Sequence, residues 1–395
     1  MPAMTTRLDR LDPYQQHFTS TVLETRERKG VQQVRLSASA FYPTAGGQAC
    51  DTGWLDGVDV TAVSEDDDGS LWHAVEGELE VSARVTGQLD WARRLEHMQQ
   101  HTGEHILGQA FYRFERHVVA VSMEHAVCTL DLSGEASWEL AMRAEQQANE
   151  AIWAAHPIST YELPDDQLGD MPLRRAPKVS GLVRIVQIGT GLRDAFDYSA
   201  CGGTHLKNSA EVGMLKIFKL ERVRGTDTRV FFNCGSRLLG DYRSKHDFVA
   251  ALGLRFSTAL EAVPVRINTA LEELERTKRE VAHLRGALAL EIAKGLTDSL
   301  CVLRLEDASL LSDLAKILIS RSGCIALLGA VDGDKALLTV ACGADVSSKA
   351  GELLKIGLPF IDGRGGGKPE LAQGSGPRVE GLTAALEAMR AAASS

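Results

Sequence analysis

Four side chains in two short segments could together bind one metal ion. The first segment is 101–105 (HTGEH) and the second is 201–205 (CGGTH). Residues i and i+4 of a helix lie on one face, so the first segment can present two imidazoles to the same ion. Three imidazoles and one thiolate suit a tetrahedral Zn²⁺ ion. The spacing therefore predicts a zinc site made of His101, His105, Cys201 and His205.

The residues around these ligands favour convergence on one ion. Gly202 and Gly203 have no Cβ atom, so the turn between Cys201 and His205 can close without steric conflict. His97 lies four residues before His101, and we favour a supporting contact for it over a rival ligand role. With four protein ligands, the site is either structural or opens when substrate displaces one ligand.

Helices and an antiparallel sheet must position these ligands. Asp90 is a plausible N-cap for a helix in which Trp91, Leu95 and Met98 recur at helical spacing up to the first segment. A second helix is expected over 138–155, ended by His156-Pro157. Strand-like runs lie at 183–188, 215–220 and 228–232. This pattern predicts a core of helices packed on an antiparallel sheet.

The N-terminal part is expected to be a small β-barrel. Strand-like runs at 21–24, 31–36, 58–63 and 71–75 are separated by short turns rich in glycine and charged residues. The acidic tract 65–69 lacks the ligand spacing of a calcium loop, so we expect a hairpin loop there.

The C-terminal part shows two further patterns. The segment 265–292 carries apolar residues at a three-four spacing that Lys278 and Arg285 interrupt, which predicts a long amphipathic helix or a short coiled-coil hairpin. It could act as a spacer or pair two chains into a homodimer, with equal weight. Short buried strands are expected at 300–305, 324–328 and 336–342, and three consecutive glycines follow at 365–367. Such a run lets the backbone approach a ligand closely.

These patterns predict an α+β protein of four parts. We expect a β-barrel domain with a glycine-rich loop (1–88), a zinc-binding α/β core (89–250), a helical linker or coiled coil (251–296) and a C-terminal α/β domain (297–395).

Composition excludes some classes of protein. Hydrophobic residues make up 44% and charged residues 24% of the 395, as in an ordinary globular protein. No apolar run reaches the roughly 18 residues of a membrane span, and no membrane partner is expected. Seven scattered cysteines indicate reduced thiols, and therefore a cytoplasmic protein.

Charge is unevenly distributed along the chain. The net charge is −10, yet the segment from Arg174 to Lys245 holds fourteen basic against six acidic residues. This local excess favours a surface that faces phosphates beside the metal over a set of merely solvated strand faces.

Several motifs together resemble a known family. The segments 101–105 and 201–205 are similar to the editing domain of alanyl-tRNA synthetase, and 41–48 (FYPTAGGQ) with 51–53 (DTG) resembles the glycine-rich loop ahead of it. The segments 221–225 (ERVRG) and 228–230 (TRV) resemble the strands that follow. The stretch 365–373 (GGGKPELAQ) resembles the C-terminal DHH-associated domain of the same synthetases.

The order and coverage of these motifs narrow the resemblance. They span most of the chain in the family's order, and the chain leaves no room for an adenylating domain ahead of them. It is therefore similar to freestanding alanyl-tRNA editing proteins of the long AlaX type.

The resemblance implies hydrolysis of the ester that joins serine or glycine to tRNA(Ala). A synthetase pocket for alanine rejects neither the smaller glycine nor serine strongly, so a second, hydrolytic site is needed. Zinc would orient the aminoacyl end or polarise a water molecule. Thr44 and Gln48 would test for the serine hydroxyl. The expected tRNA-binding residues are Arg222, Arg224, Arg229, Gly365, Gly366, Gly367 and Lys368.

One position departs from the family pattern. The synthetase motif usually has a small hydroxyl residue just before its second histidine, and this chain has Glu104. That carboxylate could be a general base, could change the selectivity of the pocket, or could be an exposed helix residue.

Two other functions remain as alternatives. An editing module of the threonyl-tRNA type shares the metal pattern, although the glycine loop and the 365–373 stretch favour the alanyl type. A non-catalytic tRNA-binding protein could keep zinc for structure alone.

Overall fold

The computed structural model describes residues 4–123, 126–169, 171–177, 180–191 and 194–394. By its contacts the chain divides into two compact units, Met1–Ala250 and Ala251–Ser395. Helices and strands occur in both units, so the protein is of the mixed α and β type that the sequence predicts.

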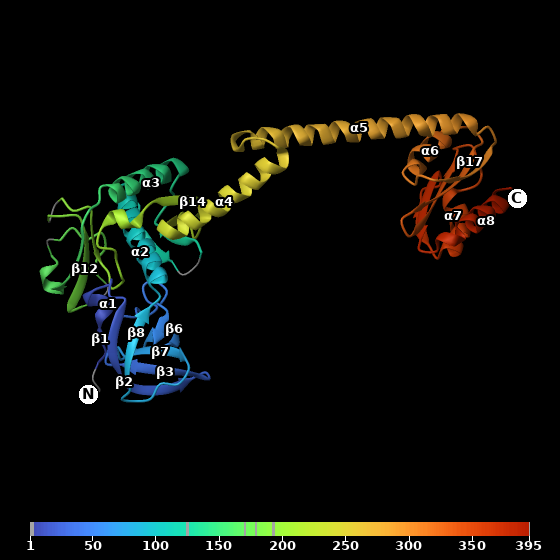
Figure 1. Ribbon diagram of the computed structural model, residues 1–395. Coiled ribbons are helices and arrows are strands. Elements are labelled where there is room, and N and C mark those ends of the chain that lie inside the picture. The colour runs from blue at the N-terminus through green and yellow to red at the C-terminus, as the bar shows by residue number, and fades with distance from the viewer. Residues whose placement is uncertain (1–3, 124–125, 170, 178–179, 192–193, 395) are drawn as a thin grey trace. The chain divides into compact units, whose positions relative to one another are not determined.

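A closed six-stranded barrel forms the first part of unit 1, as the sequence predicts (Figure 1). Its strands, in barrel order, are β2 (His17–Arg28), β3 (Val31–Leu36), β7 (Leu71–Glu76), β6 (Val58–Glu65), β5 (Gly53–Leu55) and β8 (Arg84–Leu89). Apolar side chains such as Val34, Leu36 and Leu55 fill its interior. The acidic tract forms the expected hairpin loop, closed by the bond from Gly69 N to Asp66 O (2.9 Å).

Short elements complete this end of the chain. β1 (Thr6–Arg7) pairs in parallel with β4 (Ala38–Ser39), and the single helical turn α1 (Leu8–Leu11) follows β1 directly.

Two helices and a four-stranded sheet share the largest core of unit 1. α2 (Trp91–Tyr112) starts where predicted, and the Asp90 side chain accepts a hydrogen bond from Arg93 N. α3 (Trp138–Trp153) lies beside α2 (Figure 1). The antiparallel sheet contains, in order, β14 (Leu215–Arg222), β15 (Thr228–Cys234), β10 (Cys128–Leu132) and β9 (Val118–Ser122).

A second, three-stranded antiparallel sheet carries the Cys201 segment. Its order is β11 (Ile158–Pro164), β12 (Leu182–Ile188) and β13 (Asp197–Ala200). Cys201 follows β13 directly, so the position of this strand sets where the thiol lies.

Unit 2 holds a five-stranded sheet flanked by helices. The strand order is β16 (Leu300–Leu305), β17 (Ile325–Asp332), β18 (Lys335–Cys342), β20 (Leu371–Gly376) and β19 (Arg364–Gly367). Only the β16–β17 pair is parallel among these ladders. The helices are α6 (Leu310–Ile319), α7 (Ala350–Gly357) and α8 (Leu382–Ala393).

The segment between the sheets of unit 1 and the sheet of unit 2 is helical. α4 (Gly235–Phe256) crosses the boundary between the units, and the sequence analysis did not predict it. α5 (Val263–Gly295) is a single helix of 33 residues rather than a hairpin. In the described parts of the chain no single helix is long and apolar enough to cross a membrane. The helical segments Gly235–Phe256 and Leu260–Gly295, which meet at a bend, pass that test of length and composition only when they are taken together.

Candidate metal centre and adjoining cavity

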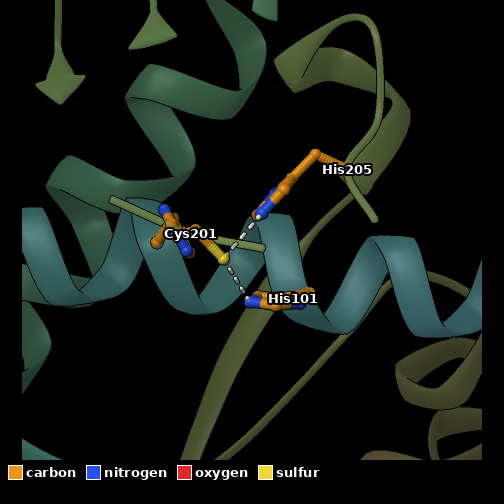
Figure 2. A group of neighbouring side chains, drawn as sticks. His101, Cys201 and His205 are labelled. Atoms are coloured by element: carbon orange, nitrogen blue, oxygen red, sulfur yellow. Dashed lines mark hydrogen bonds between the residues drawn. The ribbon is translucent and has the colours of Figure 1, made fainter. Parts of the chain in front are cut away.

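The four predicted ligands lie together in unit 1. One donor atom from each of His101, His105, Cys201 and His205 lies within 4.8 Å of the other three. His101 and His105 come from one face of α2, and the other two follow β13. Figure 2 shows the rings of His101 and His205 pointing at Cys201 Sγ, at Nε2–Sγ distances of 3.3 and 3.4 Å.

A hydrogen bond from His101 to Gln48 orients the His101 ring. Gln48 is buried, and its Oε1 lies 2.7 Å from His101 Nδ1. Because an amide oxygen only accepts, His101 Nδ1 carries the hydrogen and Nε2 keeps its lone pair for a metal. The amide nitrogen of Gln48 donates to Thr204 Oγ1 (2.9 Å), so one side chain links both ligand segments.

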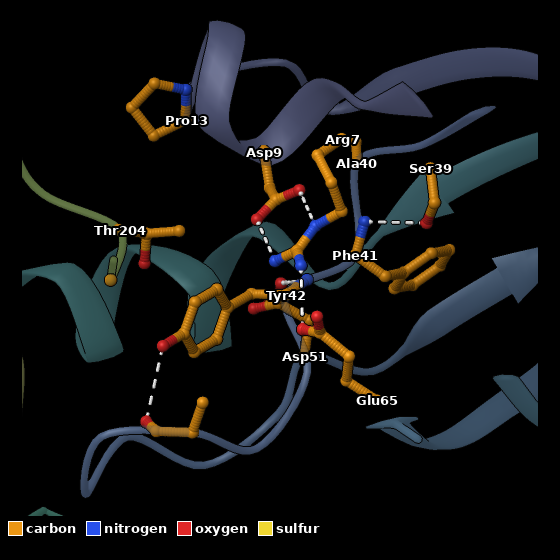
Figure 3. Close-up of polar contacts among 12 residues, drawn as sticks. Arg7, Asp9, Pro13, Ser39, Ala40, Phe41, Tyr42, Asp51, Glu65 and Thr204 are labelled. Atoms are coloured by element: carbon orange, nitrogen blue, oxygen red, sulfur yellow. Dashed lines mark hydrogen bonds and ion pairs between the residues drawn. The ribbon is translucent and has the colours of Figure 1, made fainter. Parts of the chain in front are cut away.

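The loop that carries Gln48 is itself fixed by polar contacts (Figure 3). Tyr42 N donates to Asp51 Oδ2 (2.6 Å), and the Tyr42 hydroxyl donates to Ala45 O (3.2 Å). The loop therefore holds Gln48 beside His101 by bonds at both of its ends.

The other two imidazoles have polar neighbours at Nδ1, although His105 Nδ1 makes no hydrogen bond to a described residue. His205 Nδ1 lies 3.3 Å from the hydroxyl of Thr102, which also accepts a hydrogen bond from Leu206 N. His105 Nδ1 lies 3.5 Å from Asp197 Oδ2, and both residues are buried. In all three histidines Nε2 is thus the nitrogen left for the shared centre.

The electrostatics of the cluster favour a thiolate. Burial opposes ionisation of Cys201, but the neighbouring His101, His205 and His105 hold the pKa of this thiol well below its ordinary value. Burial, followed by the charge of His101, lowers the pKa of His205 to about 3, so that imidazole is neutral at pH 7. Burial opposes protonation of His105, but the charge of Cys201 and the contact with Asp197 raise the pKa of this imidazole to about 10. Because a metal binds a thiolate and neutral imidazoles, its binding would displace the proton of His105.

The donor set and its spacing fit zinc. Tetrahedral bonds of about 2.0–2.3 Å place neighbouring ligand atoms roughly 3.3–3.7 Å apart. The two Nε2–Sγ distances fall within or at the edge of that range. His101, His105, Cys201 and His205 are therefore the residues that would hold the ion.

Close packing in the turn explains one of its two glycines. A Cβ atom on Gly203 would lie 2.1 Å from Cε1 of His101, whereas one on Gly202 would meet nothing within 4 Å. Gly203 is needed for the approach of the two ligand segments, and Gly202 is not.

A cavity of about 820 Å³ opens beside the cluster. His101, His105 and Cys201 line it, together with Glu104 and the apolar side chains of Val118, Val121 and Leu182. Among the ligands, Cys201 is the least buried. The cluster therefore lies on the wall of a space that a small organic group can enter.

Three buried or half-buried polar residues of the site were not foreseen. Arg184 donates from Nη1 to the carbonyls of Cys201 and Gly203 (2.9 Å each), which holds the metal-binding turn. Arg174 donates to His105 O (3.0 Å), and its Nε lies 3.9 Å from Asp197 Oδ1. The one signal for Arg184 was a charged residue inside the apolar run 182–188.

The other candidates for chemistry occupy distinct places. Glu104 is 5% exposed and lines the cavity, with Oε2 3.8 Å from His105 Nε2, so it is not an exposed helix residue. Thr44 is exposed, and its hydroxyl oxygen accepts from Cys50 N (3.2 Å). His97 lies outside the four-residue cluster of described residues, 3.8 Å from Glu96.

The expected tRNA-binding residues lie on two elements of different units. Arg222, Arg224 and Arg229 belong to the β14–β15 hairpin, where Arg229 is paired with Asp131 (2.7 and 2.8 Å) and Arg222 donates to Gly225 O. Gly365, Gly366, Gly367 and Lys368 are exposed, the three glycines lying in the edge strand β19. Of the fourteen basic residues counted in 174–245, Lys178 and Arg193 lie outside the described residues.

A family model matches the segment that carries Cys201 and His205. It is the threonyl and alanyl tRNA synthetase second additional domain, matched over residues 183–231.

Known proteins are similar over nearly the whole chain. An alanyl-tRNA editing protein AlaX-L of Pyrococcus horikoshii is 27% identical over 93% of this chain and 93% of its own length. An alanine–tRNA ligase of Methanothrix thermoacetophila is 30% identical over 98% of this chain but 44% of its own length. An alanine–tRNA ligase of Lactococcus lactis is 29% identical over 92% of this chain and 44% of its own length. The chain thus spans less than half the length of these ligases.

Proposed function

Because this chain belongs to the family of alanyl-tRNA editing proteins, we propose that it is an editing hydrolase that deacylates Ser-tRNA(Ala) and Gly-tRNA(Ala). The observation that carries the proposal is the His₃Cys cluster on the wall of a cavity. A metal centre with an adjoining open space can serve a substrate, whereas a structural zinc site is usually closed.

Glu104 is the proposed base of this reaction. It is a buried carboxylate in the cavity wall next to His105. We assign it the removal of a proton from the attacking water. The water oxygen bonds to the ester carbonyl carbon, the bond from that carbon to the ribose oxygen breaks, and the proton passes to the ribose oxygen.

The metal's contribution is electrostatic. Zinc, when bound, supplies a Lewis acid that polarises a carbonyl or a water molecule. Gln48, Thr102 and Asp197 then act through the ligands, because each contacts the Nδ1 side of one imidazole.

We assign different roles to Gln48 and Thr44 in recognising the serine hydroxyl. Both ends of the Gln48 amide are engaged, so it acts on selectivity through His101 rather than by direct contact with serine. Thr44 accepts a bond at its oxygen and keeps its O–H for a substrate hydroxyl. Thr44 itself is exposed and does not line the cavity, whereas Gly46 of the same loop does.

The share of the chain that is similar to an alanyl-tRNA editing protein favours the alanyl type over the threonyl type. The matched domain model is shared by both synthetases and does not separate them. The similarity to an AlaX-L protein runs along nearly the whole chain. tRNA(Ala) is accordingly the proposed partner, and the cytoplasm, where aminoacylated tRNA is used, is the proposed location.

A homodimer through α5 is part of the proposal. The side chains of Leu271, Leu274, Val281 and Leu288 are about half exposed along this helix. Their spacing is that of a coiled-coil seam, so a second copy would bury them.

Deacylation of mischarged tRNA(Ala) tests the function. Purified protein, loaded with zinc, is incubated with Ser-tRNA(Ala), and the variants Cys201→Ala and Glu104→Gln are compared with it. We expect release of serine by the wild type and strong loss of activity in both variants. Absence of release by a wild type that binds the tRNA would leave the non-catalytic alternative.

A further inference from the structure

The cavity beside the metal cluster is lined by four arginines. These are Arg10, Arg174, Arg175 and Arg184, and the carboxylates of Glu104 and Glu162 line the same cavity. Guanidinium groups gathered around one cavity attract an anionic ligand. Three of these arginines belong to the basic segment 174–245, so part of its positive charge lies beside the metal cluster.

Two of the four arginines bind backbone groups of the metal-binding segments. Arg174 is bound to His105 O and lies near Asp197, and Arg184 is bound to the carbonyls of the Cys201 turn. Their guanidinium groups hold the metal-binding segments in place, so they are engaged before any ligand arrives.

The other two arginines have no such task. Within the described part of the chain, the side chains of Arg10 and Arg175 make no hydrogen bond or ion pair, and both are exposed. They come from different elements, Arg10 from α1 and Arg175 from the loop before β12. Two free guanidinium groups from separate elements thus line the cavity that holds the metal ligands.

The position of Arg10 is fixed by its neighbours. Arg7 and Asp9 form a two-bonded ion pair (2.8 Å each), and Asp9 is buried (Figure 3). This pair anchors the turn from which Arg10 projects.

The chemistry of the substrate identifies the ligand of these arginines. An amino acid esterified to the 3′ end of an RNA lies one ribose away from the last phosphate. When the ester carbonyl is at the metal cluster, that phosphate must lie near the same cavity. Arg222, Arg224 and Arg229 do not line it.

We propose that Arg10 and Arg175 bind the phosphates of the single-stranded 3′ end of the RNA substrate and so deliver the ester to the metal centre. The proposal rests on the function proposed above, and it assigns the entry of the substrate to this cavity rather than to the β14–β15 hairpin. Each contact replaces counterions, so each arginine should contribute to the salt dependence of binding.

Binding of uncharged RNA tests this proposal without any catalytic step. The probe is a labelled RNA hairpin with the acceptor-stem sequence and a single-stranded 3′ overhang, and the second probe is the same hairpin without the overhang. Anisotropy titrations of the zinc-loaded full chain at several salt concentrations give affinity and salt slope. The variants are Arg10→Gln and Arg175→Gln. The matched control is Arg84→Gln, an exposed arginine of β8 that does not line the cavity.

We expect each cavity variant to weaken binding of the overhang hairpin at low salt by roughly tenfold. The slope of log K against log salt should become shallower by about 0.7 per arginine. Binding of the blunt hairpin and binding by Arg84→Gln should be unchanged. Wild-type affinity and slope in both cavity variants, or equal losses for both hairpins, would overturn the proposal. Overhang-dependent binding without deacylation would reject the proposed function and leave this inference standing.

Discussion

At the scale of single residues, the side chain of Gln48 connects the two ligand segments, although Gln48 itself lies in a loop. It fixes the His101 ring and reaches Thr204 in the second ligand segment. Removing a hydrogen-bond partner of a metal ligand typically costs 10–100-fold in metal affinity.

We therefore predict that Gln48→Ala weakens zinc binding by about 10–100-fold. Gln48→Glu keeps an acceptor for His101 Nδ1 and should retain much of that affinity. Competition with a chromophoric zinc chelator measures both. Equal affinity in the wild type and Gln48→Ala would show that His101 needs no such partner.

A buried histidine should make the barrel sensitive to pH. His73 is fully buried, and its ring lies 2.8 Å from Ser39 Oγ and 3.1 Å from Val34 O (Nε2 and Nδ1). Burial lowers its pKa from 6.5 to about 4. The unfolded state therefore binds a proton more readily than the folded state. Stability is retained above pH 6.5 and is lost as the pH falls toward 4.

Between pH 7 and pH 5 we expect His73 to account for about 2 kcal/mol of lost stability. Urea unfolding followed by tryptophan fluorescence measures this, since Trp54 and Trp72 lie in the barrel strands. His73→Gln should show a pH dependence smaller by that amount. A variant with the full pH dependence of the wild type would assign the effect to other groups.

At the scale of elements, the turn between Cys201 and His205 decides whether the two ligand segments meet. Gly203 packs against the His101 ring, and Gly202 faces open space. An added methyl group therefore has opposite consequences at two adjacent positions.

Gly203→Ala should lose zinc, because its Cβ would displace His101, whereas Gly202→Ala should keep one zinc per chain. Metal analysis after gel filtration gives the comparison, and circular dichroism checks that both variants fold. Full zinc content in a folded Gly203→Ala would contradict the tight approach of turn and helix.

Sequence periodicity predicted most of the helices and strands, but it did not predict which strands pair with one another. Apolar spacing and the Asp90 cap predicted α2, and alternation with short turns predicted the barrel strands. The helix α4 was missed because Gly235, Gly240 and Gly253 interrupt its pattern. Residues 365–367 were expected only to let the backbone approach a ligand, and no strand was predicted there. They form an edge strand because β20 supplies backbone partners that composition does not reveal.

The site was predictable only in part, for a related reason. The i, i+4 spacings identified the four residues that the structure brings together. No regular spacing in the sequence identifies Arg174, Arg184 and Asp197 as residues of the site. They become visible only when β12 and β13 bring them to the ligand segments.

At the scale of the whole molecule, the candidate metal ligands and the proposed dimerisation helix lie in different units. All four candidate ligands and Gln48 lie in unit 1, and α5 lies in unit 2. A fragment that ends at Phe256 keeps α4 intact and removes α5.

We predict that this fragment binds one zinc ion, is monomeric and binds tRNA(Ala) more weakly than the full chain, which should be a dimer. Analytical ultracentrifugation and metal analysis measure these properties. A dimeric fragment would exclude α5 as the element that pairs two chains, and a folded fragment without zinc would contradict the independence of unit 1.

The most direct test of the central claim is the ratio of deacylation rates on two forms of tRNA(Ala). Single-turnover hydrolysis of Ser-tRNA(Ala) and Ala-tRNA(Ala) is followed with the same zinc-loaded protein, and Gly-tRNA(Ala) serves as a third substrate. Serine differs from alanine by one hydroxyl, and a hydrogen bond to that hydroxyl contributes on the order of 0.5–1.5 kcal/mol. We therefore predict hydrolysis of the seryl ester roughly 2–12-fold faster than that of the alanyl ester. Equal rates on both esters, or no hydrolysis of either, would contradict the assignment of this chain as an editing hydrolase.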